Sequence, residues 1–437
     1  MHLPKPPGDF IHAKSLHMHV MKFGGASVKD APSIQNVGNI IRQHLNEPLV
    51  VVVSAIDKTT NNLETLAYLA RDNKQEEALE QFRKIRRFHI HLIHDLIGQD
   101  HLHRVQERVR VFFDEIERIV QGILLLEEFP PRIYDRIVSY GELLATRIVA
   151  EYLDSIGQEV VWLDARKLVK TDANYRQAGV IWSLTEENIR KEVGPLLKPG
   201  SVVIVQGFIG STTDNHTTTL GREGSDYTGS IFAHCLNASR FSVWKDVPGV
   251  LNGDPRIREN TIKLDNLSYE EAVEMTFYGA SVIHPNTIKP IFNKGIPLHV
   301  KTFKDVSLPG TVISEKTNPE VITSYILKKE QAFVRIKPKD FSFMEERLMR
   351  EVFDHIYKSG LKVNLVQNSA ISLMLCVDDK EGPLSDFEAL LLDRFSVEIR
   401  KGLSLHTFIN YSDKDLEGSS AAVMMQQHEN KLFLVKG

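Results

Sequence analysis

The chain has 437 residues, of which 42% are hydrophobic and 25% charged, and its formal net charge at pH 7 is −4. This length predicts two or three domains, and the mild negative charge gives no reason to expect a nucleic acid or an anionic membrane as a partner. The longest apolar stretches, 49–53 and 122–126, are too short to span a bilayer. Cys235 and Cys376 lie in apolar runs, which predicts buried free thiols and a reducing, cytoplasmic setting.

The chain begins with prolines and histidines but with no apolar core of a secretory signal, so we expect residues 1–17 to form a disordered extension. After them, short apolar runs alternate with segments of helical period, which predicts a parallel α/β sheet. The predicted helices include 30–45, 136–156 and 270–279. The predicted strands are 19–23, 48–56, 159–163, 201–207, 241–247 and 296–302, and the last of these is expected to end the sheet.

Residues 62–128 are charged and helical in period without strands, and we interpret them as a helical excursion from the sheet. His91 and His94 share a helix face there, so a metal site is one reading of this segment. No carboxylate or cysteine pattern accompanies these histidines. We therefore predict a solvated or partly packed helix surface and no metal site.

The clearest chemical signal lies between the first strand and the first helix, where the sequence reads Lys22-Phe23-Gly24-Gly25-Ala26-Ser27-Val28. Adjacent glycines let a backbone turn approach a phosphate with its N–H groups pointing inward, and a lysine before them can place a positive charge on that phosphate. The helix that we expect to begin at Asp30 and Pro32 adds the partial positive charge of its N-terminus. A Walker loop, G-x-x-x-x-G-K-[ST], does not occur in the chain.

The pattern changes after a polar segment at 311–319, where we place a domain boundary. A strand at 332–337, a helix that Ser342 and Glu345 would cap and Gly360 would close, and strands at 362–367 and 370–377 follow. This β-α-β-β order is typical of a ferredoxin-like module. Strands at 397–409 and 431–435 indicate a second such unit, whose central helix is missing or reduced to a short stretch around 418–426.

Several segments, in this order, resemble the aspartokinases of the amino-acid kinase family: 22–28, 52–55 with 60–61, 139–142, 206–210, 219–228, 246–249 with 254–256, and 277–285. The C-terminal part resembles paired ACT domains. The resemblance implies an α/β fold, with an amino-acid kinase three-layer αβα sandwich at 18–312 followed by ferredoxin-like (ACT) α+β regulatory units at 320–437. The second ACT unit is expected to be shortened.

The resemblance also implies roles for individual residues. Lys22 would stabilise the transferring phosphoryl group, and Asp226 would orient it. Arg222 would grip the substrate α-carboxylate, and Glu142 would pair with its α-ammonium group. The remaining residues implied at the site are polar substrate contacts, Ser54, Thr60 and Ser225, and nucleotide contacts, Gly24, Gly25, Lys245, Asp246, Arg256 and Ser281.

The sequence departs from the family pattern at five positions. Ala26 replaces a threonine in the glycine turn, and Glu223 stands where a glycine is common. Three further departures touch the ATP side and put nucleotide affinity in doubt: Lys245 for a threonine, Leu251 for a tyrosine and Ser281 for a lysine.

The leading hypothesis is an aspartate kinase, which uses ATP and Mg²⁺ to form 4-phospho-L-aspartate on the route to lysine, threonine and methionine. The acceptor carboxylate is already ionised at pH 7, so the site needs cations and backbone amides and no general base. One alternative is a catalytically weak, amino-acid-binding regulatory paralogue, and another is an amino-acid kinase with a different acceptor. The implied partners are L-aspartate, ATP, a lysine or threonine effector and a second copy bound through the ACT-like region.

Overall fold

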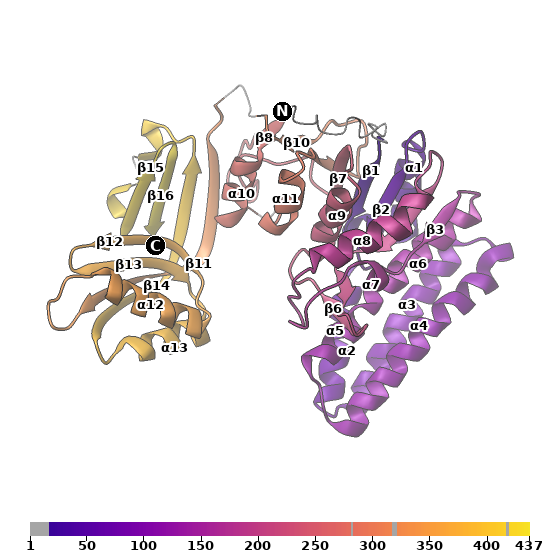
Figure 1. Ribbon diagram of the computed structural model, residues 1–437, viewed down its shortest axis with the longest axis horizontal. Helices are drawn as coiled ribbons and strands as arrows, with labels where there is room; N and C mark the ends of the chain where they lie inside the picture. The colour runs from indigo at the N-terminus through magenta and orange to yellow at the C-terminus, as the bar shows by residue number, and fades with distance from the viewer. Residues whose placement is uncertain (1–16, 281–282, 317–320, 417–418) are drawn as a thin grey trace, which may run out of the picture. The chain divides into compact units, whose positions relative to one another are not determined.

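The computed structural model describes residues 17–280, 283–316, 321–416 and 419–437. The described residues divide into two compact units (Figure 1). The first unit lies within Met1–Val250, Asp265–Tyr269 and His284–Thr317, and the second within Leu251–Leu264, Glu270–Ile283 and Asn318–Gly437. The extension predicted at 1–17 falls almost wholly outside the described residues. Across the described ranges, no helix has the length and apolar character that a membrane span requires.

An eight-stranded sheet in the order β3-β4-β2-β1-β7-β9-β10-β8 forms the centre of the first unit. Every neighbouring pair is parallel except β9 and β10. The five central residues of β2 are all buried, as its unbroken valine run predicts for a strand covered on both faces. The strands are β1 (His19–Phe23), β2 (Leu49–Val53), β3 (Val160–Trp162), β4 (Val202–Gln206), β7 (Arg240–Lys245), β8 (Asn266–Ser268), β9 (Leu298–Thr302) and β10 (Thr311–Ser314).

Helices cover both faces of this sheet, which confirms the predicted three-layer α/β fold. Met21 and Phe23 of β1 pack into the large core that includes residues of α1 (Ala31–Arg42) and α6 (Tyr140–Ser155). Lys22 lies between them and points to the other face, toward α9 (Gly224–Cys235). The other helices of this unit are α5 (Pro131–Val138), α7 (Ala165–Leu168), α8 (Trp182–Val193) and α11 (Pro285–Phe292), and a small hairpin pairs β5 (Ile209–Ser211) with β6 (Thr217–Thr219).

The predicted helical excursion is confirmed as α2 (Thr59–Arg71), α3 (Gln75–Leu96) and α4 (Gln99–Leu126), and no strand interrupts it. Figure 1 shows α3 and α4 side by side as the two longest helices of the unit. Their apolar residues join the same core as α1 and α6. The excursion is therefore part of the layer that carries α6.

The second unit contains a six-stranded antiparallel sheet in the order β12-β13-β11-β14-β16-β15. α12 (Glu346–Ser359) and α13 (Glu381–Leu391) pack on one face around Val334, Leu348 and Phe387. α10 (Tyr269–Phe277) belongs to this unit from Glu270 on. The strands are β11 (Ser324–Pro338), β12 (Val363–Ser369), β13 (Ser372–Asp378), β14 (Phe395–Ile409), β15 (Met424–His428) and β16 (Lys431–Lys436).

Four expectations need correction. The strand at 296–302 does not end the first sheet, because β10 follows it through the polar segment at 311–319. The two ACT-like halves do not follow one another as separate modules, because β11 and β14 each run through both halves of one sheet. The first half has a further helix, α13, which was not predicted. The capping box does not form, since Ser342 donates to Asp340 and leaves α12 uncapped by a side chain.

The shortened second half is confirmed. Between β14 and β15 the described residues form only short 3₁₀ turns, at Asp413–Leu416 and Ser419–Ala421. Both faces of β16 are nevertheless buried, since Leu432 and Leu434 alternate with Phe433 and Val435 and all four side chains are shielded from solvent. The absence of a long helix from the described residues between β14 and β15 therefore leaves β16 covered on both faces.

Candidate active site

The carboxyl ends of four parallel strands meet at one edge of the first sheet. Phe23 of β1 pairs in register with Val53 of β2 and Trp244 of β7, and Val53 pairs with Gln206 of β4. The segments that follow these residues therefore leave the sheet side by side. In open α/β sheets this edge is where ligands bind.

The glycine turn after β1 packs tightly against the segment that follows β2. A Cβ atom on Gly25 would lie 2.9 Å from the carbonyl oxygen of Ala55 and 3.1 Å from that of Asp57, so only glycine fits there. The turn continues into a 3₁₀ segment, and Asp30 then caps α1 by accepting a hydrogen bond from the Ser33 N–H at 2.9 Å. The predicted helix start is confirmed, and Gly24 and Gly25 are partly exposed at the sheet edge.

Lys22 and Lys245 share one buried carboxylate. The Lys22 ammonium lies 2.5 Å from Asp226 Oδ1, and the Lys245 ammonium lies 3.2 Å from Asp226 Oδ2. Burial opposes the ionisation of Asp226, but the two cations outweigh it and hold its pKa below the usual value. Two ammonium groups therefore lie at one carboxylate beside the glycine turn, a placement that suits a phosphate.

Glu142 lies in the first turn of α6 and is buried, with 3% of its surface exposed. Its Oε1 accepts a hydrogen bond from the Ala55 N–H at 3.3 Å, while its Oε2 has no hydrogen-bond partner among the described residues. Burial raises the pKa of Glu142 to about 8, although the Ala55 N–H and the Lys22 cation oppose this shift. A buried carboxylate with one free oxygen is suited to an ammonium group from a ligand.

Thr60 and Ser54 lie next to Glu142 through the start of α6. A Cβ atom on Gly141 would lie 2.9 Å from Ala55 Cβ and 3.3 Å from Thr60 Oγ1, so the glycine allows α6 and the 54–60 segment to touch. Ser54 is partly exposed at the end of β2, where its N–H donates to the Phe23 carbonyl at 3.0 Å. Ser225 is buried in the first turn of α9, beside Asp226.

The structure does not bring Arg222 to Glu142. Arg222 is exposed just before α9, and it lines a cavity of about 620 Å³ formed largely by α8, α9 and α11. The next residue, Glu223, has φ of 52°, in the left-handed region that favours glycine. This explains why glycine is common in the family at that position.

The predicted nucleotide contacts fall in both units. Asp246 is exposed directly after Lys245. Arg256 belongs to the second unit and is exposed, and its guanidinium forms an ion pair with Asp254 at 2.7 Å. Ser281 lies outside the described residues. The roles of these three residues stay predictions.

Asp135 is a residue of the site region that the sequence reasoning missed. It is fully buried on α5, and its carboxylate accepts hydrogen bonds from the N–H groups of Arg176 and Thr219 and from the Thr219 hydroxyl. Burial raises the pKa of Asp135, and these hydrogen bonds oppose that rise. The carboxylate ties α5 to β6, which leads to Arg222.

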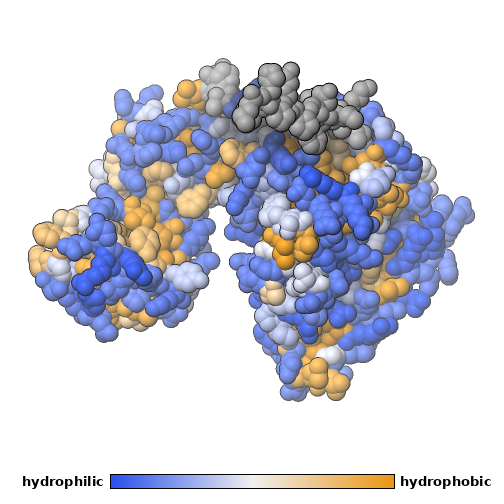
Figure 2. All heavy atoms as spheres, viewed as in Figure 1, coloured by the Kyte–Doolittle hydropathy of each residue, from blue (hydrophilic) through white to orange (hydrophobic). Residues whose placement is uncertain are grey.

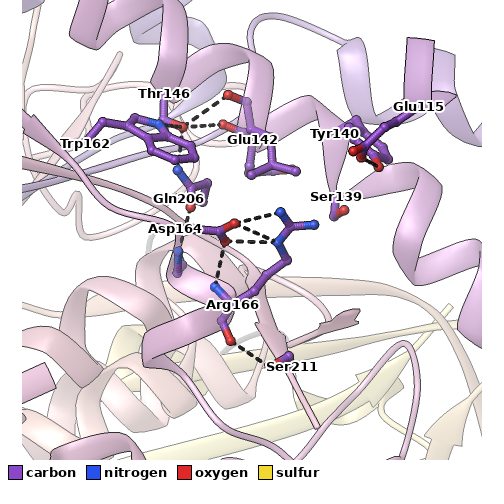
Figure 3. Close-up of polar contacts among 12 residues, drawn as sticks. Glu115, Ser139, Tyr140, Glu142, Thr146, Trp162, Asp164, Arg166, Gln206 and Ser211 are labelled. Carbon is purple, nitrogen blue, oxygen red and sulfur yellow. Dashed lines mark hydrogen bonds and ion pairs between the residues drawn. The ribbon is translucent and has the colours of Figure 1, made fainter. Parts of the chain in front are cut away.

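A second missed set of contacts joins α6 to the end of β4 (Figure 3). The Gln206 side chain donates to Thr146 Oγ1 at 2.7 Å and accepts from the Ala165 N–H at 2.7 Å. The Thr146 hydroxyl in turn donates to the Glu142 carbonyl at 2.8 Å. Phe208, two residues after Gln206, has φ of 67°, a strained conformation of the kind that clusters at functional sites.

The histidines of the helical excursion contact different partners, although His91 and His94 line one cavity. His91 is exposed with Asp95 at 3.6 Å, His94 contacts Gln106, and His89 is fully buried instead of facing solvent. In the described ranges, no group of three or more histidine, cysteine, aspartate or glutamate side chains has the arrangement of a metal site.

Comparison with known proteins gives a consistent result. Residues 18–302 match the amino acid kinase family. The lysine-sensitive aspartokinase 3 of Escherichia coli (strain K12) is 32% identical over 408 residues, which cover 89% of this chain and 86% of that protein. Aspartokinase 1, chloroplastic, of Arabidopsis thaliana is 31% identical over 367 residues, which cover 82% of this chain and 63% of that protein.

The solved structures agree with this relationship. The structure of E. coli aspartokinase III in complex with aspartate and ADP matches with a TM-score of 0.83 and 27% identity, covering 96% of both chains. The complex of the same enzyme with lysine and aspartate matches with a TM-score of 0.78 and 28% identity. The glycine turn, the shared Asp226 carboxylate and the antiparallel C-terminal sheet thus lie in a chain that belongs to the amino acid kinase family and, within it, to the aspartokinases.

Proposed function

We propose that this chain is an ATP-dependent aspartate kinase, which transfers the γ-phosphate of ATP to the side-chain carboxylate of L-aspartate and yields 4-phospho-L-aspartate and ADP. The observation that carries the proposal is the convergence of the Lys22 and Lys245 ammonium groups on Asp226, beside the glycine turn, with Lys22 within electrostatic range of Glu142. The relatives named aspartokinases, and the neighbour with aspartate and ADP bound, support it.

The mechanism needs positioning and charge neutralisation more than proton transfer. The aspartate side chain has an ordinary pKa near 3.9, so it attacks as the carboxylate. Lys22 and the backbone N–H groups of Gly24 and Gly25 would stabilise the negative charge on the transferring phosphoryl group, and Asp226 would keep the Lys22 ammonium in place.

The substrate would be held by groups of opposite charge at its other end. Glu142 has a free buried oxygen for the α-ammonium group. Arg222 would bind the α-carboxylate with its planar fork, and this requires its exposed side chain to turn toward the substrate. Ser54, Thr60 and Ser225 would supply hydrogen bonds.

Nucleotide binding would fall to the glycine turn and the segment after β7, with Lys245, Asp246, Arg256 and Ser281 as proposed contacts. Mg²⁺ neutralises charge on the phosphates when it binds. The described part of the chain gathers no acidic cluster of its own for a metal, so we propose that ATP phosphates provide most of the Mg²⁺ ligands.

The experiment is a product assay of the full chain with ATP, Mg²⁺ and a panel of amino acids. ADP release and trapping of the acyl phosphate by hydroxylamine are measured together. Both signals with aspartate alone support the proposal. Signals with another amino acid indicate a different acceptor. Binding of aspartate without turnover supports the alternative of a weak regulatory paralogue, which the ATP-side departures at Lys245, Leu251 and Ser281 motivate.

We also propose a division of labour between a kinase domain at 18–312 and a regulatory region at 320–437, and a homodimer formed through the latter. Exposed aromatic side chains on and before α12 support the dimer: Phe341, Phe343, Phe353 and Tyr357 are all at least 42% exposed. Most of the surface in Figure 2 is hydrophilic, and hydrophobic patches interrupt it. The buried free thiols of Cys235 and Cys376 support a cytoplasmic setting.

Feedback by lysine or threonine is proposed to be weak. The related E. coli enzyme is named lysine-sensitive, but the described residues between β14 and β15 form only 3₁₀ turns, and Asn364 is already bound by Lys328 and Gln331. We expect less than half inhibition by 1 mM lysine, threonine or both at subsaturating aspartate. Half inhibition below about 1 mM, an affinity of about −4 kcal/mol or tighter, would contradict this expectation.

A further inference from the structure

The start of α6 is held from two sides. Glu142 points toward the Ala55 N–H, and Gly141 packs on the same segment. Tyr140, two positions before Glu142, lies about 200° away around the helix axis, because successive helix residues are about 100° apart. The side of α6 opposite the substrate site is therefore the one that Tyr140 occupies.

Tyr140 is anchored to the helical excursion. Its side chain is fully buried, and its hydroxyl donates a short hydrogen bond to Glu115 Oε2 on α4. Figure 3 shows this pair set apart from the contacts that join Thr146 to Gln206. The ring of Phe112, one turn before Glu115, lies 6.3 Å from the Tyr140 ring and packs beside it. At the first turn of α6, α4 thus contributes this hydrogen bond and the packed Phe112 ring, and further along α6 the ion pairs of Arg104 and Arg108 with Glu151 join the same two helices.

Charged groups of other elements face the pair. Burial and the Glu115 carboxylate raise the pKa of Tyr140, and Arg136 of α5 opposes that shift. Arg166 of α7 also lies within electrostatic range of both Tyr140 and Glu115. Tyr140 therefore stays a neutral donor to the Glu115 carboxylate.

We propose that Tyr140 and Glu115 are positioning residues for aspartate: their hydrogen bond fixes the rotation of the first turn of α6, and so fixes the Glu142 carboxylate toward the substrate ammonium group. The proposal rests on the proposed function. It gives the helical excursion a task in substrate binding, although neither residue touches the substrate.

The test compares Tyr140→Phe with the wild-type enzyme in the full chain. Loss of the hydroxyl should raise the aspartate KM about fivefold, as expected for one net hydrogen bond, and leave kcat and the ATP KM within twofold. Glu115→Gln keeps an acceptor oxygen and should stay near wild type, whereas Glu115→Leu should repeat the Tyr140→Phe result.

Tyr134→Phe is the matched control. The Tyr134 hydroxyl donates to Glu64 Oε1 at 2.8 Å in the same helical layer but on α5, away from the first turn of α6. This variant should not change the aspartate KM. An unchanged KM in Tyr140→Phe, or an equal rise in Tyr134→Phe, would overturn the proposal.

Three outcomes can be told apart: a variant that does not fold, a wild-type chain that is not an aspartate kinase, and an aspartate kinase in which Tyr140 and Glu115 do not position Glu142. If Tyr140→Phe does not fold, the Glu115→Gln and Glu115→Leu pair decides the matter through the same KM comparison. A wild-type chain that forms no acyl phosphate from aspartate contradicts the proposed function. An active wild-type chain whose variants keep its KM contradicts the positioning role alone.

Discussion

Each unit of the molecule contains a lysine–aspartate pair, and the two pairs have nearly the same geometry. The ammonium–carboxylate distance is 2.5 Å for Lys22 and Asp226 and 2.6 Å for Lys328 and Asp378. In both pairs burial works against the ionised aspartate, and its partners still hold its pKa below the usual value. Distance and charge state therefore do not separate a catalytic pair from a structural one.

The surroundings separate them. Asp226 faces two ammonium groups beside the glycine turn, and the nearby Glu142 has an oxygen without a hydrogen-bond partner among the described residues. Lys328 is bound by Asn364 and Asp378, and the Asn364 amide also donates to Asp378 and to Gln331. The second cluster satisfies itself, whereas the first is complete only with a ligand. Unsatisfied groups distinguish a site from a structural network.

The largest expected effect tests this distinction directly. Lys22→Met should lower kcat by about 10²–10³-fold, because a charge aimed at the phosphoryl group is lost. The fold should survive, since Lys245 still neutralises Asp226. Acyl phosphate formation at saturating substrates measures kcat.

Lys328→Met is the matched variant in the second unit. It should leave kcat within twofold and lower the free energy of unfolding by about 1–3 kcal/mol, because a partly buried carboxylate loses its cation. Thermal unfolding measures this loss. A Lys328→Met enzyme with the kinetic defect of Lys22→Met would erase the distinction between the two clusters.

The next largest effect concerns Arg222, which the structure leaves exposed. Arg222→Lys should raise the aspartate KM at least tenfold, because one ammonium group cannot reproduce a bidentate grip on a carboxylate. The ATP KM should change much less. Steady-state kinetics with each substrate varied in turn distinguish the two, and a larger shift in the ATP KM would assign Arg222 to the phosphate side.

A smaller effect follows from the pKa of about 8 at the buried Glu142. An ammonium group binds the ionised form, so the aspartate KM should fall about fivefold between pH 7 and pH 8, as for a single titration. The pKa of Glu142 in the folded protein lies above its ordinary value near 4.5. The ligand-free protein should therefore lose stability as the pH rises from about 4.5 to about 8. Glu142→Gln should abolish both pH dependences, and their persistence would assign them to another group.

The smallest expected effect concerns backbone strain, which both clusters share. Glu223, near Asp226, has φ of 52°, and Glu330, next to Gln331, has φ of 56°. Glu223→Gly and Glu330→Gly should each raise the free energy of unfolding by about 0.5–1 kcal/mol, because relief of a left-handed conformation exceeds the added chain entropy. Neither should change kcat more than twofold. A large loss of kcat in Glu223→Gly alone would show that strain near Asp226 is functional.

Much of the first unit could be predicted because its signals are local. The buried valine run of β2, the glycine turn and the Asp30 cap each follow from a few neighbouring residues. β10 escaped prediction because it is short and lies in a polar segment. α13 escaped because Gly382 and Pro383 in its first turn resemble a loop, although proline is tolerated there.

The candidate site was predictable only in part. The Lys22–Asp226 contact follows the family resemblance, since both residues fall in motif segments. The link between Lys245 and Asp226 and the burial of Asp135 depend on how helices cross the sheet, and no local pattern reports that. The sequence did not indicate that both halves of the C-terminal sheet share β11 and β14. The polar residues 328–331 resemble a loop that precedes a strand, whereas in the structure they form a bulge within β11.

These two continuous strands bear on how the C-terminal part can fold. β11 and β14 have 15 residues each, a span of about 50 Å, and each supplies backbone partners to both halves of the sheet. A chain that ended near residue 400 would leave residues 324–328 without the partners at 405–409 that they pair with in the structure. Because both halves share these two strands, they should melt in one cooperative step, and during synthesis residues 324–328 should stay unpaired until residues 405–409 have emerged.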